Sequence, residues 1–356
     1  MVEPVLLRRQ AGGDDAPRVH RASRRFGNAR AGLPLPAPRL RRTRERRAPV
    51  PAGMMRVGIS LTSANQTSDP RETARFLIER AAAAQRAGLD SLFVGDHHST
   101  PGPYYQNVPI MARLLAEWGD RPAGCLFLLP LWNPVLVAEQ IGTLAAIARG
   151  RFILQAGLGY GEEQFLAMGA NIKQRPSAFE ESLGIIRRLL AGEAVSSDHR
   201  FHLENAQLAL RPAEPVDVWI AGTAEPAIDR AARLADGWLV SPEPTFDEAR
   251  ALITHYRARC AAHQRTPTAI AIRRDIYVGE SATEADATAR AIVDRGYRGF
   301  DPSALVWGDA KAVTEKFRTL GAMGYTDVIV RHLTNEQPKV LGSLARLAEV
   351  RQALAG

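Results

Sequence analysis

The strongest constraint on the fold is a regular alternation of short apolar segments and helix-like segments, which begins at residue 56 and continues to the C-terminus. The apolar segments indicate parallel strands, because a strand buried on both faces is apolar throughout rather than alternating. Eight segments fit this description: 56–61, 91–94, 123–129, 152–156, 216–221, 237–240, 269–278 and 327–330.

Helices are expected between the strands. Asp69 and Asn133 each precede a proline, which is the typical start of a helix with a capping side chain. The predicted helices cover 70–87, 134–148, 176–191, 225–235, 246–263, 309–323 and 337–354. Eight strands with intervening helices over about 300 residues predict an α/β fold, a (β/α)₈ TIM barrel, with a doubly wound open sheet as the alternative. A polar hairpin at 195–210 and a partly helical segment at 279–306 predict insertions after strands four and seven.

The first 53 residues differ from the rest in composition. They carry 13 arginines and four acidic residues, a net charge of +9, whereas the whole chain carries +8. Residues 54–356 therefore sum to about −1, and we expect no nucleic-acid partner for them. A segment so rich in Arg and Pro buries too little apolar surface to fold, so we predict a disordered extension at 1–53 and one barrel domain at 54–356. A start at Met54 or Met55, a targeting segment, and nucleic-acid binding by the extension are the alternatives.

Two further features bear on the compartment. No apolar run approaches the roughly 18 residues that a membrane helix needs. Cys125 and Cys260 lie far apart in the sequence, which excludes a disulfide framework or a cysteine metal site defined by spacing. We therefore expect a cytoplasmic protein without a membrane partner.

A glycine and then three ionisable residues follow the second strand, in the sequence GDHHS. The C-terminal ends of barrel strands form the functional mouth, which places Asp96, His97 and His98 there. Because neighbouring side chains alternate in direction, we expect only one imidazole to face the barrel axis. The residues are either loop-capping histidines or a catalytic imidazole with a pKa near the working pH. A metal site that includes His332, after the eighth strand, is a less favoured alternative.

Glycines follow the fourth strand in the sequence GLGYG. Gly157, Gly159 and Tyr160 are candidate cofactor contacts. The glycines either allow the backbone to approach a ligand closely or form a tight turn. Their spacing is not that of a dinucleotide-binding fingerprint.

A second glycine-containing turn follows the fifth strand. Ala221, Gly222 and Thr223 directly precede a helix, so free backbone N–H groups and the positive end of that helix are expected to form an anion cradle. The alternative is that Thr223 only caps the helix.

These motifs occur together and in one order: VGDHHS, LLPLWNPVLVAEQIGTLAAIARGRFILQAGLGYGEEQF, RPSAFEESLGIIRRLLAGE and WIAGTAEPAIDRAARLADGWLVS. From about Met55 to the C-terminus the chain resembles the bacterial luciferase-like family of flavin-dependent oxidoreductases and monooxygenases. The resemblance implies a barrel that holds the flavin ring at its C-terminal mouth and the flavin phosphate on Gly222 and Thr223.

The resemblance also implies roles for individual residues. His97 matches the active-site histidine, and Asp96 matches an acid near the pyrimidine edge of a deazaflavin. A bulge with a non-prolyl cis peptide is implied in strand three, where Gly124 and Cys125 would line the flavin. True luciferases have an acidic residue where this chain has Gly222, which argues against light emission.

The implied activity is that of a monooxygenase that uses O₂ and reduced FMN, the latter supplied by a separate flavin reductase, on a small organic substrate. The alternative is hydride transfer with the deazaflavin coenzyme F420, in which His97 acts as the base or acid. Alternatives from other classes are a metal-dependent hydrolase with His97, His98 and His332 as ligands, and a flavin-binding protein without catalysis. A homodimer is expected.

The segment 279–306 is a candidate lid, because long excursions from a barrel often have that role. Arg273, Arg274 and Arg298 lie in or near it. They either meet an anionic substrate or deazaflavin tail, or form solvated surface.

Overall fold

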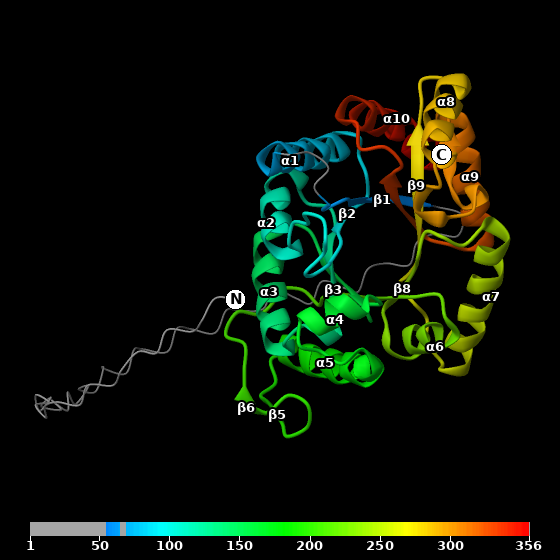
Figure 1. Cartoon of the computed structure of the whole chain (residues 1–356). Helices are drawn as coiled ribbons and strands as arrows, with labels where there is room; N and C mark the ends of the chain where they lie inside the picture. The colour runs from blue at the N-terminus through cyan, green and yellow to red at the C-terminus, as the bar shows by residue number, and fades with distance from the viewer. Residues whose placement is uncertain (1–54, 65–68, 356) are drawn as a thin grey trace, which may run out of the picture. The chain divides into compact units, whose positions relative to one another are not determined.

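The computed structural model describes residues 55–64 and 69–355, so the predicted disordered extension at 1–53 lies outside the described residues. Within them, eight parallel strands close into a ring (Figure 1). The order around the ring is β1 (Arg56–Leu61), β2 (Ser91–Val94), β3 (Ala123–Leu128), β4 (Phe152–Gly157), β7 (Asp217–Ala221), β8 (Gly237–Val240), β9 (Ala269–Val278) and β11 (Asp327–His332). Pairing of β8 with β9 and of β11 with β1 closes the ring. The TIM-barrel prediction is confirmed, and the open-sheet alternative is wrong.

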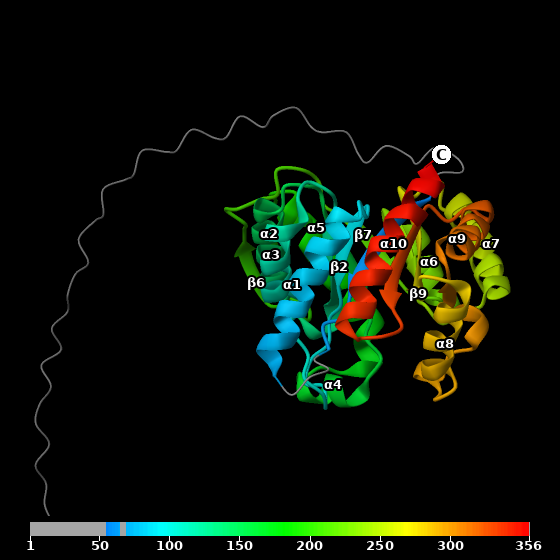
Figure 2. The same cartoon turned by 90° about the horizontal axis from the view of Figure 1, so that it is seen from above.

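Helices surround the ring and cover the outer faces of the strands (Figure 2). They are α1 (Pro70–Arg86), α2 (Asn107–Trp118), α3 (Pro134–Ile147), α5 (Arg175–Leu190), α6 (Glu225–Leu234), α7 (Phe246–Ala262), α9 (Ala310–Met323) and α10 (Gln337–Ala355). Asp69 and Asn133 accept hydrogen bonds from backbone N–H groups of the first turns of α1 and α3, as their positions predict. None of the helices in the described ranges is long and apolar enough to cross a bilayer.

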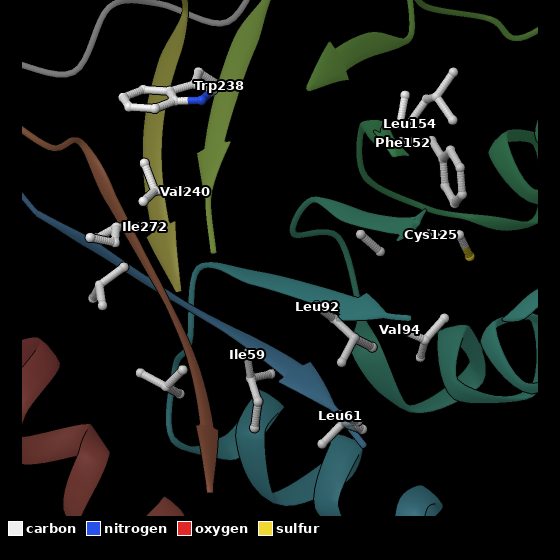
Figure 3. Packing of buried hydrophobic residues seen from close by; sticks show 14 of the residues in the cluster. Ile59, Leu61, Leu92, Val94, Cys125, Phe152, Leu154, Trp238, Val240 and Ile272 are labelled. Atoms are coloured by element: carbon white, nitrogen blue, oxygen red, sulfur yellow. The ribbon is translucent and has the colours of Figure 1, made fainter. Parts of the chain in front are cut away.

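The core has two layers, because successive side chains of each strand point to opposite faces of the barrel wall. A small cluster that includes Phe93, Ile153 and Trp219 fills the barrel interior, and the rings of Phe93 and Trp219 lie 5.5 Å apart. A larger cluster packs between the strands and the helices; Figure 3 shows part of it, including Leu92 and Val94. Burial of each large apolar side chain contributes about 1.5–3 kcal/mol. The interior cluster fills the barrel between its strands. The residues at and after the C-terminal ends of the strands form the mouth.

Strand β3 corrects two predictions. It pairs regularly with β2 and β4, and no cis peptide bond occurs in the part of the chain that the structure describes. Gly124 lies level with Phe93 and Ile153 in the filled interior, where a Cβ atom would lie 2.1 Å from the Ile153 carbonyl oxygen. The Cys125 side chain is fully buried on the outer side of the wall, 3.9 Å from the Asn107 carbonyl oxygen. Neither residue lines the cavity at the mouth, since the glycine is needed for strand packing and the thiol belongs to the outer core; their cofactor contacts stay a prediction.

The predicted insertions are present. After β4 come the short helices α4 (Glu162–Ala167) and η2 (Ile172–Gln174), and after α5 comes the antiparallel hairpin β5 (Val195–Ser197) and β6 (Leu203–Ala206). After β9 come α8 (Ala282–Val293), η3 (Tyr297–Gly299), η4 (Pro302–Ala304) and β10 (Val306–Gly308), which pairs with the upper part of β9. A turn of 3₁₀ helix, η1 (Leu129–Leu131), follows β3. Figure 2 shows α4 and α8 at the same end of the barrel.

Candidate active site

The C-terminal mouth of the barrel contains a cavity of about 490 Å³, a size typical of small-ligand sites. Its lining comes from segments far apart in the sequence: the ends of β1, β2, β9 and β11, the loop after β2, and the insertion after β9. Much of the lining is polar, and it includes His97, Tyr104, Tyr160, Arg273, Arg298 and Arg331.

His97 is the imidazole that faces this cavity. Its ring lies edge-on to Tyr104 at 5.1 Å and to Tyr160 at 6.2 Å, measured between ring centroids. Burial lowers the pKa of His97 below 6.5; the neighbouring carboxylate Asp96 opposes this effect, and the cations Arg331 and Arg273 add to it. The imidazole is therefore neutral near pH 7, so one ring nitrogen is available to accept a proton.

Asp96 and His98 lie behind the cavity wall. The Asp96 carboxylate is fully buried, and its Oδ2 accepts hydrogen bonds from the Leu128 backbone N–H at 2.8 Å and from Trp132 Nε1 at 2.9 Å. Its Oδ1 lies 3.2 Å from His98 Nε2, although the angle is not that of a hydrogen bond. The expectation that only one imidazole faces the axis agrees with this geometry. The carboxylate joins the turn after β2 to the end of β3 and to Trp132, outside the cavity lining, and its contact with a cofactor ring stays a prediction.

His332 also lies outside the cavity. Its ring is buried against α10, with Nε2 3.0 Å from the Ser343 hydroxyl, which in turn accepts a hydrogen bond from the Val278 backbone N–H. Burial lowers the pKa of His332 to about 3. Over the described ranges no three His, Cys, Asp or Glu side chains come together as a metal site. The alternative of a hydrolase with His97, His98 and His332 as ligands is therefore wrong.

Three arginines line the cavity: Arg273 of β9, Arg331 of β11 and Arg298 of the insertion after β9. Arg298 is paired: its Nη1 lies 2.7 Å from Oδ2 of the fully buried Asp275, which also accepts a hydrogen bond from the Tyr297 hydroxyl. Arg273 and Arg331 are half-buried, and the Nε atom of each is buried without a hydrogen-bond partner among the described residues. The cavity wall is therefore rich in positive charge.

Two of the three arginines named from the sequence thus lie in the cavity. Arg274 is fully buried on the outer side of the wall, over the Phe246 ring, and donates to the Pro242 carbonyl oxygen, so neither of its predicted environments was right. Arg331 was missed. Side chains alternate between the two faces of a strand, and Arg331 lies two residues after Ile329, which points into the barrel. Extending β11 by one residue beyond its predicted end would therefore have identified Arg331.

The glycines after β4 have mainly structural explanations. Gly159 has a positive φ of 76°, and a Cβ atom there would lie 2.9 Å from the Phe165 ring. Gly157 is buried at the end of β4, with Leu128 beside it. Tyr160, 78% exposed, is the residue of the three that lines the cavity.

The predicted anion cradle after β7 is outside this cavity. Gly222 has a positive φ of 144°, and its N–H donates to the Leu239 carbonyl oxygen, so it is not the free donor that the sequence suggested. Helix α6 begins at Glu225 with Ala224 as its N-cap residue, which means that the alternative of a Thr223 cap is wrong. Ala224 has no side-chain acceptor, but Pro226 lacks an N–H group and the Ala227 N–H donates to the Ala224 carbonyl oxygen, so within the first turn the Glu225 N–H is left for an anion. The phosphate contact of Ala221, Gly222 and Thr223 stays a prediction.

Comparison with known proteins identifies a family and several relatives that this chain resembles in sequence. A family model described as luciferase-like monooxygenase matches residues 55–336. Curated relatives include F420-dependent glucose-6-phosphate dehydrogenases from Intrasporangium calvum, 32% identical over 200 residues (52% of this chain, 58% of the relative), and from Kribbella flavida, 29% identical over 177 residues (47% and 53%). The chain thus spans about half the length of these curated relatives.

Solved structures agree at the level of the fold. A monooxygenase from Streptomyces bottropensis superposes with a TM-score of 0.73 at 18% identity, covering 85% of this chain and 100% of the other. The oxygenating constituent of 3,6-diketocamphane monooxygenase from Pseudomonas putida, in complex with FMN, gives 0.70 at 18% identity (83% and 97%). An F420-dependent secondary alcohol dehydrogenase gives 0.68 at 16% identity (84% and 98%). Because the family model covers most of the chain, this protein belongs to the luciferase-like monooxygenase family of oxidoreductases.

Proposed function

We propose that this protein transfers a hydride between coenzyme F420 and a small organic substrate. F420-dependent dehydrogenases among the curated relatives, at up to 32% identity, support this reading over the FMN-dependent monooxygenase that the family resemblance first suggested. The observation that carries the proposal is the neutral His97 imidazole in a polar cavity.

The described residues fit a bound deazaflavin. Tyr160 and Leu126 provide apolar surface in the cavity for a planar ring, and the turn between β7 and α6, with Thr223 and the Glu225 N–H at the positive end of the helix, is the candidate place for the phosphate of the coenzyme. When bound, F420 supplies a two-electron acceptor or donor of hydride.

His97 would move the proton that accompanies the hydride. When a substrate alcohol is oxidised, its hydroxyl proton leaves as the carbon–hydrogen bond breaks, and a neutral imidazole in the cavity can accept that proton. In the reverse direction the protonated imidazole returns it to the carbonyl oxygen. The burial that keeps His97 neutral therefore suits the direction of substrate oxidation.

The second candidate is an FMN-dependent monooxygenase, which the FMN-bound camphane enzyme among the structural neighbours favours. Oxygen chemistry on a reduced flavin needs a site that keeps water out. The cavity described above is less suited to this, because three arginines line it and Tyr160 at its edge is 78% exposed.

Equilibrium titration of the full chain with F420 and with FMN, each oxidised and reduced, tests the proposal. We expect F420 to bind more tightly than FMN, and the F420 complex to lose its deazaflavin absorbance with a substrate from a panel of alcohols and sugar phosphates. Binding of FMN alone, with oxygen consumption in the presence of reduced FMN, would contradict the proposal and support the second candidate.

A further inference from the structure

The arginines of the cavity differ in their partners, and this difference leads beyond the choice of cofactor. We propose that Arg273 and Arg331 form an anion subsite that binds a phosphate or carboxylate group of the substrate. The inference rests on the proposed function for the identity of the reaction, but not for the existence of the subsite.

The topology brings the two side chains together. Strands β9 and β11 are neighbours, Arg273 is level with Ile329, and Arg331 is level with Asp275, two residues further along. Two residues of rise and one strand spacing separate their Cα atoms by about 8 Å, which two arginine side chains of this length can bridge with one anion. Both side chains line the same cavity.

The carboxylate in this part of the cavity wall, Asp275, already pairs with a third arginine. Asp275 binds Arg298 and the Tyr297 hydroxyl through Oδ2, so the carboxylate offsets the charge of Arg298. Neither Arg273 nor Arg331 forms an ion pair with any residue in ranges 55–64 and 69–355, and their Nε atoms are buried without partners. The subsite therefore holds close to two uncompensated positive charges.

Such an arrangement is costly without a ligand. Burial lowers the pKa of Arg273, and repulsion from Arg331 and Arg298 lowers it further, while Asp275 partly offsets both effects. Buried charges are retained where something pairs with them, and a bound anion would relieve both the desolvation and the repulsion. Neither guanidinium forms a hydrogen bond or ion pair that links the cavity wall to another described element, so a structural role does not explain the free-energy cost of burying them. We therefore interpret the pair as a preformed binding site.

The donor geometry narrows the class of ligand. A guanidinium offers a planar pair of N–H groups that matches carboxylate or phosphate oxygens. Ser60 faces the same cavity from β1, the strand next to β11, and adds a hydroxyl. Two cations and a hydroxyl favour a compact anion such as a phosphate monoester. Because the predicted cradle for the coenzyme phosphate at Thr223 lies outside this cavity, the subsite is assigned to the substrate.

The test uses inorganic phosphate as the probe and four variants of the full chain. Arg273→Gln and Arg331→Gln each remove one cation from the subsite, and the double variant removes both. Arg295→Gln is the matched control, since this exposed arginine lies on the same insertion as Arg298 but outside the cavity lining. Calorimetric titration with phosphate is carried out with and without bound F420. We expect each subsite variant to weaken phosphate binding by about tenfold or more, and the control to bind as the wild type does. Thermal unfolding is expected to show all four variants folded, because the subsite substitutions remove repulsion and Arg295 is exposed.

Two results would overturn the inference. Equal phosphate affinity in the wild type and in the double variant of Arg273 and Arg331 would exclude the subsite. The second result would assign the arginines to the coenzyme tail instead. In that case the variants bind F420 more weakly but bind the tail-free deazaflavin nucleoside as the wild type does, and phosphate displaces F420. If the protein binds no F420 at all, the proposed function fails, whereas titration of the cofactor-free protein with phosphate still decides the subsite.

Discussion

Asp96 and His97 are consecutive in the chain, yet their side chains lie on opposite sides of the barrel wall. His97 lines the cavity, whereas the Asp96 carboxylate is buried behind it and accepts hydrogen bonds from the Leu128 N–H and Trp132 Nε1. Through the wall, the carboxylate still raises the pKa of His97 and opposes the larger effect of burial. We therefore propose that Asp96 acts on the imidazole by its charge.

Asp96→Asn should lower the pKa of His97 further. The variant loses the negative charge that favours the imidazolium form, so the fall in activity on acidification, which follows protonation of His97, should move to lower pH. We also expect unfolding to become easier by about 1 kcal/mol, because both hydrogen bonds end on Oδ2, where a neutral amide oxygen accepts them less strongly than the carboxylate does. NMR titration of the His97 ring protons in wild type and variant measures the shift. Superimposable titration curves would contradict the electrostatic role.

His97→Ala should reduce turnover by about 10²-fold or more while F420 binding stays within a few-fold, since the imidazole moves a proton and does not hold the coenzyme. His199→Ala is the control, because that side chain is 83% exposed and outside the cavity. Steady-state rates together with F420 titrations separate the two effects. Turnover equal to that of the control variant would remove His97 from the mechanism.

The barrel could be predicted because its signals are local. Apolar strands, proline after a capping residue, and glycine turns each depend on a few neighbouring residues, and together they place the mouth. Helix α2 was not assigned, since its N-cap residue Gln106 makes no side-chain cap hydrogen bond within the described part of the chain and Pro109 stands at the third helical position rather than at the first. Helix starts without these signals are stabilised by packing, which a single sequence does not display.

The site was predicted only in part for a different reason. His97 follows from the rule that strand ends form the mouth, but the direction of Asp96 and Cys125 depends on register and on the path of the chain after the strand. Tyr104 was missed because the loop that carries it is positioned by a bridge to Ala64, forty residues earlier. Long-range contacts of this kind leave no periodic signal in the sequence.

Tyr104→Phe should lower turnover by roughly five- to tenfold with little change in F420 binding. Burial raises the pKa of Tyr104 to about 12, so its hydroxyl remains a donor at neutral pH. That hydroxyl lies over Gly95, where an added Cβ atom would be 2.6 Å away, and the ring contacts His97. Tyr105→Phe is the matched control, because its hydroxyl donates to the Pro70 carbonyl oxygen away from the cavity. Equal rates for the two variants would show that the Tyr104 hydroxyl does not meet the substrate.

Gly222→Ala should weaken binding of the coenzyme through its phosphate. The residue has a φ of 144°, and a Cβ atom would lie 2.7 Å from that of Ala227 in α6, so the turn before the helix must shift. We expect a loss of stability of about 1–3 kcal/mol and a larger loss of affinity for F420 than for its phosphate-free nucleoside. Gly184→Ala, an exposed helical position with no atom within 4 Å of the added methyl, should instead stabilise by about 0.5–1 kcal/mol. Equal losses of affinity for both ligands would place the phosphate elsewhere.

His332 should make the stability of the protein depend on pH. Its pKa is about 3 in the folded protein, whereas an accessible imidazole has a pKa of 6.5, so between these values the unfolded chain binds a proton that the folded protein excludes. The stabilisation is present above pH 6.5 and is lost as the pH falls toward 3, by up to about 1.4 kcal/mol per pH unit. His332→Asn should therefore flatten the dependence measured by urea unfolding between about pH 7.5 and 5.5, by about 1.4 kcal/mol relative to wild type. His199→Asn should leave the slope unchanged, because that imidazole is exposed in both states. Parallel curves for wild type and His332→Asn would mean that the buried ring accepts a proton without unfolding, which its hydrogen bond with Ser343 and its position against α10 argue against.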